Sequence, residues 1–275
     1  MQRTLIALFR WLPLGMLYGV MALVIPFYML LGKGFRASYQ FFRKRLGMGC
    51  LRAFCHVYLN EFRMGQVVLD RFAAFSGKEF RMDVPERGLF DRLAAGGKGF
   101  IMLSSHTGCY ELVGYTLRSD RPIHVLVYSG ETKTVMENRR RLFEAMNIRM
   151  IPVSEDLSHV FSLNGALADG DIVSMPGDRR FGSQKAVRCR FFGEEASFPM
   201  GPFMLSIQRQ VPVLQVFVMK AGRRDYKVFL SEIPVPETGT REERIQQMAD
   251  TYAATLEQVV RRYPDQWFNF FDFWA

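Results

Sequence analysis

His106 and Glu111 are the two residues whose types and spacing best suit acid–base chemistry. Five steps along a helix turn through roughly 500°, so the two side chains would not share one face of a helix. They can meet if His106 lies in a turn before a helix and Glu111 lies in the first or second helical turn. Glu111 could then accept a hydrogen bond from one ring nitrogen and leave the other nitrogen as a base. A helix-capping histidine beside a solvated glutamate fits the same spacing.

Residues 99–104 must form the strand that delivers His106 to this turn. They are apolar and β-prone, whereas residues 112–117 have helical spacing. A strand-to-helix turn lies at the mouth of an α/β sheet, where ligands usually bind. We therefore expect His106 to face a ligand site.

Several segments, in order along the chain, resemble one enzyme family. A strand followed by His-x-x-x-x-Asp/Glu resembles the first motif of the glycerolipid and lysophospholipid acyltransferases. Residues 171–182, with Asp178 near their end, resemble the strand and Asp-x-x-Tyr/Phe-Gly element of the bacterial lipid A biosynthesis acyltransferases. Residues 198–202 and 264–268 resemble that family as well.

The resemblance implies a reaction and a set of site residues. A fatty acyl group would move from a thioester of acyl carrier protein or coenzyme A to a lipid A precursor. His106 would be the general base and Glu111 its partner, and no metal or redox cofactor is implied. Asp178 would face the site and either hold an arginine or bind the acceptor. The expected substrate-binding residues are Asp178, Arg141, Arg179 and Arg180. Arg179, Arg180 and the backbone N–H groups after His106 are also candidates for stabilising the oxyanion.

Other functions remain open beside this one. Lysophospholipids and aminoacyl lipids are alternative acceptors within the same superfamily. A serine hydrolase would use Ser104 or Ser105 with His106, but the chain has no Gly-x-Ser-x-Gly element. Cys109 is a further candidate nucleophile. A non-catalytic, basic, membrane-binding protein is the third class.

The N-terminal region predicts a membrane anchor. Residues 12–31 carry no charge, and twenty helical residues span roughly 30 Å of hydrocarbon. The run is long for a signal peptide, and no Ala-x-Ala-like site follows it. We expect a transmembrane anchor over residues 1–32 and a basic, helical, membrane-proximal region over residues 33–79. Basic residues that follow a membrane span usually lie on its cytoplasmic side and can bind anionic lipids. They therefore predict a catalytic domain on the cytoplasmic face of a bacterial inner membrane. The basic residues of this region are Lys33, Arg36, Arg43, Lys44, Arg45 and Arg52.

Residues 80–275 alternate between strand and helix patterns, which predicts one α/β domain. Its expected architecture is a single mixed, mainly parallel sheet flanked by helices, like that of the glycerolipid acyltransferases. Expected strands cover residues 123–128, 148–153, 171–175, 211–219 and 226–232. Expected helices cover residues 132–146, 157–168 and 241–263. The aromatic residues 267–274 should pack on this domain.

The net charge limits the range of partners. The chain has 275 residues and a formal net charge of +9. This charge suits membrane lipids, an acidic carrier protein or a phosphate-bearing substrate. We expect no nucleic acid partner, because the basic residues form no recognised module. Four cysteines without a disulfide-like spacing indicate reduced thiols.

Overall fold

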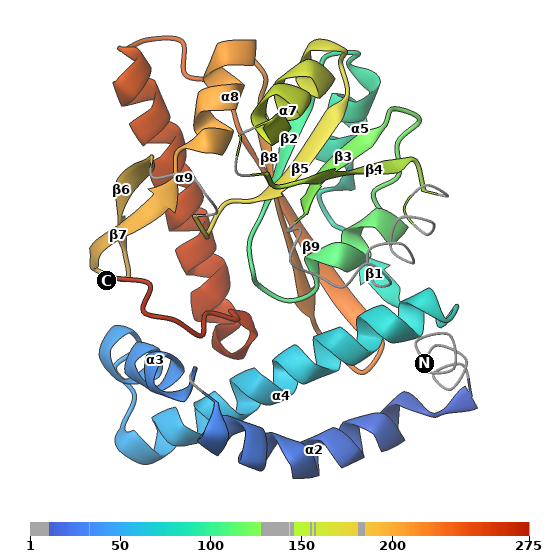
Figure 1. The fold of residues 1–275 in the computed structure, drawn as a ribbon, viewed down its shortest axis with the longest axis vertical. Helices are drawn as coiled ribbons and strands as arrows, with labels where there is room; N and C mark the ends of the chain where they lie inside the picture. Colours follow the sequence, from blue (N-terminus) through green and yellow to red (C-terminus); the bar gives the residue numbers. More distant parts are fainter. Residues whose placement is uncertain are drawn as a thin grey trace.

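The computed structural model describes residues 11–32, 34–127, 143, 146–154, 156, 158–180 and 185–274 (Figure 1). Its helices are α2 (Leu14–Leu31), α3 (Phe35–Gln40), α4 (Cys50–Phe75), α5 (Arg87–Ala95), α7 (Ser158–Ala168), α8 (Gly201–Arg209) and α9 (Arg241–Arg262). A π-helix η1 (Phe41–Arg45) and two 3-10 helices, η2 (Tyr110–Tyr115) and η3 (Pro264–Gln266), join them. The strands are β1 (Arg81–Asp83), β2 (Phe100–Ser104), β3 (Ile123–Val127), β4 (Ile148–Pro152), β5 (Ile172–Pro176), β6 (Ala186–Phe191), β7 (Glu194–Pro199), β8 (Val213–Lys220) and β9 (Asp225–Ile233).

One seven-stranded sheet forms the centre of the molecule, with the order β1-β9-β8-β2-β5-β3-β4. All its pairs are parallel except β8 with β9. The predicted mixed, mainly parallel sheet is therefore confirmed. Strands β2 and β5 lie side by side within the sheet, where both faces are covered, and their sequences are accordingly mostly apolar.

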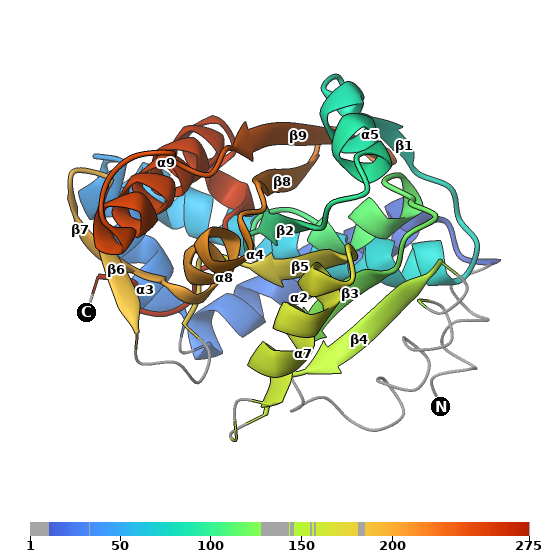
Figure 2. The same cartoon turned by 90° about the horizontal axis from the view of Figure 1, so that it is seen from above.

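The two faces of the sheet bury separate apolar layers. On β2, Ile101 and Leu103 face the layer that contains α7, α8 and α9, whereas Phe100 and Met102 face the layer that contains α5 and η2. This alternation follows from the two-residue period of a strand. Figure 2 shows the two sets of helices on opposite sides of the sheet.

The antiparallel pair β6–β7 lies outside this sheet and was not predicted. Its strands have the alternating burial of a two-stranded ribbon that packs one face on the core, and β6 packs against α9. The predicted strands and the final helix are present, with shifts of one or two residues at their ends. Most of the predicted helix over 132–146 lies outside the described residues.

Helix α2 lies alongside α4 beneath the sheet (Figure 1). No helix in the described part of the chain combines the length and hydropathy that a membrane crossing needs. Within the predicted helical region over residues 33–79, the structure has α3, η1 and α4. Side chains on one side of α2, including Leu14 and Ile25, are buried.

A buried polar cluster attaches α2 to the body of the protein. The Asp70 carboxylate of α4 accepts hydrogen bonds from Tyr18 of α2, Lys220 of β8 and Tyr226 of β9. Asp70 is fully buried, and the side chain of Lys220 is 1% exposed. A buried ion pair is tolerated only when its remaining polar atoms are hydrogen-bonded. Here the two tyrosines donate to the carboxylate of Asp70, and Lys220 also donates to the carbonyl of Arg223.

Candidate active site

The parallel pairing of β2 with β5 brings His106 and Asp178 together. Ser104 lies opposite Pro176 in the ladder, so residues two positions beyond each strand also lie opposite each other. The His106 Nδ1 atom is 2.7 Å from Asp178 Oδ1. The carboxyl ends of adjacent parallel strands thus supply both members of the pair, as in other open α/β sheets.

Three donors surround the Asp178 carboxylate, which is 1% exposed. In addition to the His106 ring, the His106 backbone N–H donates to Oδ2 at 2.9 Å, and Trp267 Nε1 donates to the same oxygen at 3.3 Å. Burial raises the pKa of Asp178, but the charge and hydrogen bonds of His106, together with the charge of Arg179, outweigh burial and hold the pKa below its ordinary value. Asp178 is therefore an anion next to the imidazole.

The negatively charged Asp178, in contact with Nδ1, determines the tautomer of His106. The carboxylate accepts a hydrogen bond, so the network assigns the proton to Nδ1 and the lone pair to Nε2. The same contact stabilises the imidazolium that forms when Nε2 takes a proton. The side chain of His106 is 18% exposed, so the ring reaches the cavity described below.

Glu111 was expected to accept a hydrogen bond from one ring nitrogen of His106, but the carboxylate on the ring is that of Asp178, which contacts Nδ1. Glu111 lies in the first turn of η2, a 3-10 helix where an α-helix was expected, and its Oε1 accepts from Arg71 Nη1 of α4 at 2.9 Å. Burial lowers the pKa of Arg71, but Glu111 outweighs it and raises that pKa. Glu111 and Arg71 form an ion pair in the same cavity wall as His106.

The turn that carries His106 is fixed by its backbone. The N–H of Gly108 donates to the carbonyl of Gln266, and the N–H of Cys109 donates to Val218, each at 2.8 Å. Gly108 has a φ of +50°, and a Cβ there would lie 2.0 Å from the Val218 oxygen, so only glycine fits. Gly108 and Cys109 follow His106, and their N–H groups are therefore already used, so neither is available as the oxyanion donor that was expected after His106. The N–H of His106 itself is bound to Asp178.

Residues near the end of the described chain complete the site. The backbone N–H of Phe268 donates to the carbonyl of His106 at 2.9 Å, and Thr107 forms a β-bridge with Trp267. On the other side, Asn60 of α4 donates to the carbonyls of Asp265 and Trp267, at 3.1 and 3.0 Å. The sequence predicted that this aromatic segment packs on the domain, and it does, but its contact with Asp178 was missed.

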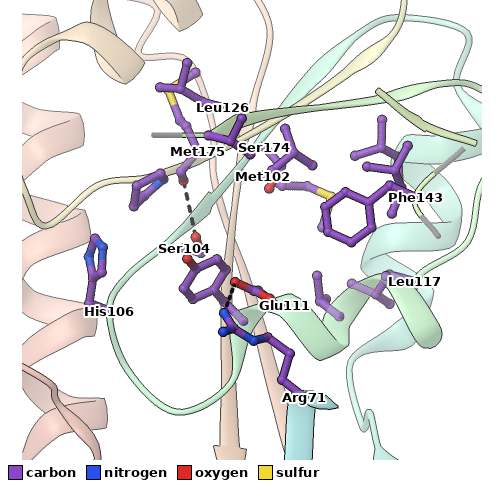
Figure 3. Close-up of a pocket in the computed structure, with 18 of the residues that line it drawn as sticks. Arg71, Met102, Ser104, His106, Glu111, Leu117, Leu126, Phe143, Ser174 and Met175 are labelled. Atoms are coloured by element: carbon purple, nitrogen blue, oxygen red, sulfur yellow. Dashed lines mark hydrogen bonds and ion pairs between the residues drawn. The ribbon is translucent and has the colours of Figure 1, made fainter. Parts of the chain in front are cut away.

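An apolar cavity of about 200 Å³ opens beside His106 (Figure 3). His106, Tyr110, Glu111 and Arg71 line one end. The rest of the wall comes from β2 to β5, η2 and nearby loops and is mostly apolar: Met102, Val113, Leu117, Ile123, Val125, Leu126, Val127, Phe143, Ile148, Val153 and Met175. A cavity with one polar end and an apolar body suits a chain whose reactive group lies at its end.

The predicted arginines have different positions. Arg179 follows Asp178, donates through Nη2 to the carbonyl of Phe268, and lines a second cavity that also includes His106. Burial lowers the pKa of Arg179, although Asp178 and Tyr110 act in the opposite direction. Arg180 is exposed and lines neither of these cavities. Arg141 lies outside the described residues.

The alternative nucleophiles are held in other contacts. Ser105 is 1% exposed and its Oγ pairs with Thr107 Oγ1 at 2.8 Å, whereas Ser104 Oγ donates to the carbonyl of Met175. Burial raises the pKa of the Cys109 thiol well above its ordinary range, so the reactive thiolate is disfavoured. Among the described residues, no group of His, Cys, Asp and Glu side chains is arranged to hold a metal ion.

Comparison with known proteins identifies the family. Residues 74–275 match the family model described as bacterial lipid A biosynthesis acyltransferase. No curated protein matches the chain. The match covers more than half of the chain and includes β2, β5, His106, Asp178 and the segment around Trp267. The chain therefore belongs to the bacterial lipid A biosynthesis acyltransferase family.

Proposed function

We propose that the protein transfers a fatty acyl group from an acyl thioester to a hydroxyl or amino group of a lipid A-like lipid, with His106 as the general base. The observation that carries this proposal is the His106–Asp178 pair at the polar end of an apolar cavity. Family membership supports an acyltransferase that acts on lipid A-like lipids. Asp178 acts as a positioning residue, a role that we expected of Glu111.

The chemical step follows from the tautomer of His106. Nε2 takes the proton of the acceptor hydroxyl while the acceptor oxygen attacks the thioester carbonyl carbon. The carbonyl oxygen becomes an oxyanion in a tetrahedral intermediate. When the intermediate collapses, the C–S bond breaks, and the imidazolium returns its proton to the thiolate that leaves. The products are the acylated lipid and the free thiol of the donor, so no protein nucleophile is needed.

The larger cavity would hold the acyl chain of the donor. Its apolar walls favour an alkyl chain by the hydrophobic effect, and the thioester would then lie at the polar end beside His106. Arg71 lines that end and carries a positive charge, so it is our candidate for stabilising the oxyanion. In this scheme Glu111 holds the Arg71 guanidinium in place.

A membrane surface is the proposed location of the reaction, because an acylated lipid is insoluble in water. One face of α2 exposes large apolar side chains: Met16, Val20, Leu23, Val24, Phe27 and Leu31. Basic side chains are exposed on the neighbouring segments: Arg36, Arg43, Lys44 and Arg52. An apolar stripe beside basic residues suits an anionic bilayer surface. We place the catalytic domain on the cytoplasmic face of a bacterial inner membrane, where acyl carrier protein or coenzyme A would supply the thioester.

The test is acyl transfer by the purified protein from a thioester donor to a lipid A precursor. Replacing His106 with Ala should lower turnover by about two to four orders of magnitude, as expected for the loss of a general base. The matched control is His124→Ala, because His124 also pairs with an aspartate, Asp171, at 2.8 Å, but lines neither cavity. Full activity in His106→Ala, or equal losses in both variants, would contradict the proposal.

A further inference from the structure

A second cavity meets the larger one at His106. It has a volume of about 190 Å³ and lies between α4 and residues 268–270. Four residues belong to the walls of both cavities: Arg71, His106, Tyr110 and Glu111. A base with a cavity on each side can receive two substrates at the same time, one from each cavity.

The walls of the second cavity are apolar except at the end near His106. Met64, Val67 and Val68 of α4 face Phe268 and Phe270 across it. These side chains can contact an alkyl chain or the apolar part of a lipid. The second cavity therefore also suits an amphiphile.

Positive charge distinguishes the second cavity from the first. Arg179 lines the second cavity and is absent from the walls of the first. Within the described residues, the Nε atoms of Arg179 and Arg71 are buried and have no hydrogen-bond partner. Buried donors are nearly always hydrogen-bonded, and a guanidinium binds phosphate or carboxylate oxygens especially well. Because Arg71 is already paired with Glu111, the orphaned donor of Arg179 is the one that points to an anionic group in the ligand.

We propose that the second cavity binds the acceptor, an anionic lipid, and that Arg179 recognises its phosphate or carboxylate group. This inference rests on the proposed function, in which the larger cavity holds the acyl chain of the donor. The thioester group itself is uncharged, so the part of the donor that would lie beside His106 supplies no anion for Arg179. The acceptor hydroxyl would approach Nε2 of His106 from the side of α4, opposite the donor.

The first experiment separates the two substrates by steady-state kinetics. Val68 lines only the second cavity, and Val125 lines only the larger one. Val68→Trp should raise the KM of the acceptor at least about tenfold and change the KM of the donor much less. Val125→Trp, the matched control, should instead raise the KM of the donor. The opposite pattern, or no change in acceptor KM, would overturn the assignment.

Arg179→Gln should also raise the acceptor KM at least about tenfold, because a charge-assisted hydrogen bond is lost. Arg179→Lys keeps the charge and should retain part of the affinity. Thermal melts of both variants show whether the contact between Arg179 and the Phe268 carbonyl is needed for folding. A rise in KM of the donor and acceptor alike would contradict a role in acceptor recognition.

Direct binding distinguishes failure of this inference from failure of the proposed function. The probes are a short-chain lysophosphatidic acid and the corresponding uncharged monoacylglycerol, each titrated into the wild-type protein and into the Val68→Trp and Arg179→Gln variants. Tighter binding of the anionic probe, weakened by both substitutions, would support the cavity even if no transfer were detected. Equal binding of the two probes, or binding that neither substitution weakens, would refute it.

Discussion

At the scale of single residues, the partner of His106 decides what the site can do. Asp178 accepts from the imidazole Nδ1 and is itself held by Trp267. In Asp178→Asn the charge that stabilises the imidazolium is lost. We expect kcat to fall by two or more orders of magnitude while the KM of each substrate changes little, because Asp178 acts through His106 and lines neither cavity. Glu111→Gln, which leaves Asp178 in place, should lower kcat less.

The lowered pKa of Asp178 also predicts how stability depends on pH. The pKa of the Asp178 carboxyl group is lower in the folded state than in the unfolded state, where it is about 4. Such a group stabilises the folded state at every pH above about 4, and this stabilisation is lost as the pH falls through the pKa of the folded state. The free energy of unfolding of the wild type should therefore decrease more steeply below about pH 4 than that of Asp178→Asn. Urea titrations at several pH values measure the two slopes. A slope that is identical in both proteins would contradict the contribution of Asp178.

The sequence could identify His106 as a candidate base but not the carboxylate that contacts its ring. Glu111 is close to His106 along the chain, so spacing favoured it. Asp178 is 72 residues away, and only the pairing of β2 with β5 shows that it reaches Nδ1. The resemblance had already placed Asp178 at the site, as a substrate-binding residue. Trp267 belongs to residues 264–268, which were also part of the resemblance, but nothing in the sequence placed its ring beside Asp178.

At the scale of elements, α4 and residues 264–268 hold the turn that carries His106. Asn60 is 1% exposed and joins them through two backbone carbonyls. In Asn60→Ala both carbonyls lose their donor, so we expect the free energy of unfolding to fall by about 2–4 kcal/mol, with a loss of activity. The control is Asn164→Ala on the far helix α7, which removes the acceptor of a hydrogen bond from Arg209 of α8 and should leave kcat unchanged. Equal activity in the two variants would show that this connection does not support the site.

The elements were predicted unevenly for a physical reason. Buried parallel strands such as β2 and β5 are short apolar runs, and the long amphipathic helix α9 begins with a capping box at Thr240 and Glu243, so local sequence identifies them. The segment after His106 forms a 3-10 helix instead of an α-helix, and its course follows from contacts with β8 and the segment around Gln266. Such contacts between distant segments leave little trace in the spacing of residues.

At the scale of the whole molecule, the apolar stripe of α2 and the basic residues beside it share one function in our proposal. We expect the protein to bind anionic vesicles and salt to weaken this binding, because the electrostatic part is screened. Replacing both Leu23 and Phe27 with Ser removes apolar area without adding charge, and it should weaken binding by at least about tenfold. The control is Phe161→Ser, since Phe161 is 77% exposed on α7, away from α2 (Figure 1). Unchanged vesicle binding in the α2 variant would remove this surface from the membrane interface.

The pairing of β2 with β5 also has a consequence for insertions and deletions. Residues 104 and 176, and then 106 and 178, lie opposite each other, so the geometry of the His106–Asp178 pair is set by strand register. One residue gained or lost between either strand and its catalytic side chain would move that side chain by about 3.3 Å and reverse its direction. The connections between the strands carry no such restriction. Enzymes that share this arrangement can therefore vary widely in loop length, while the two-residue steps after β2 and β5 stay constant.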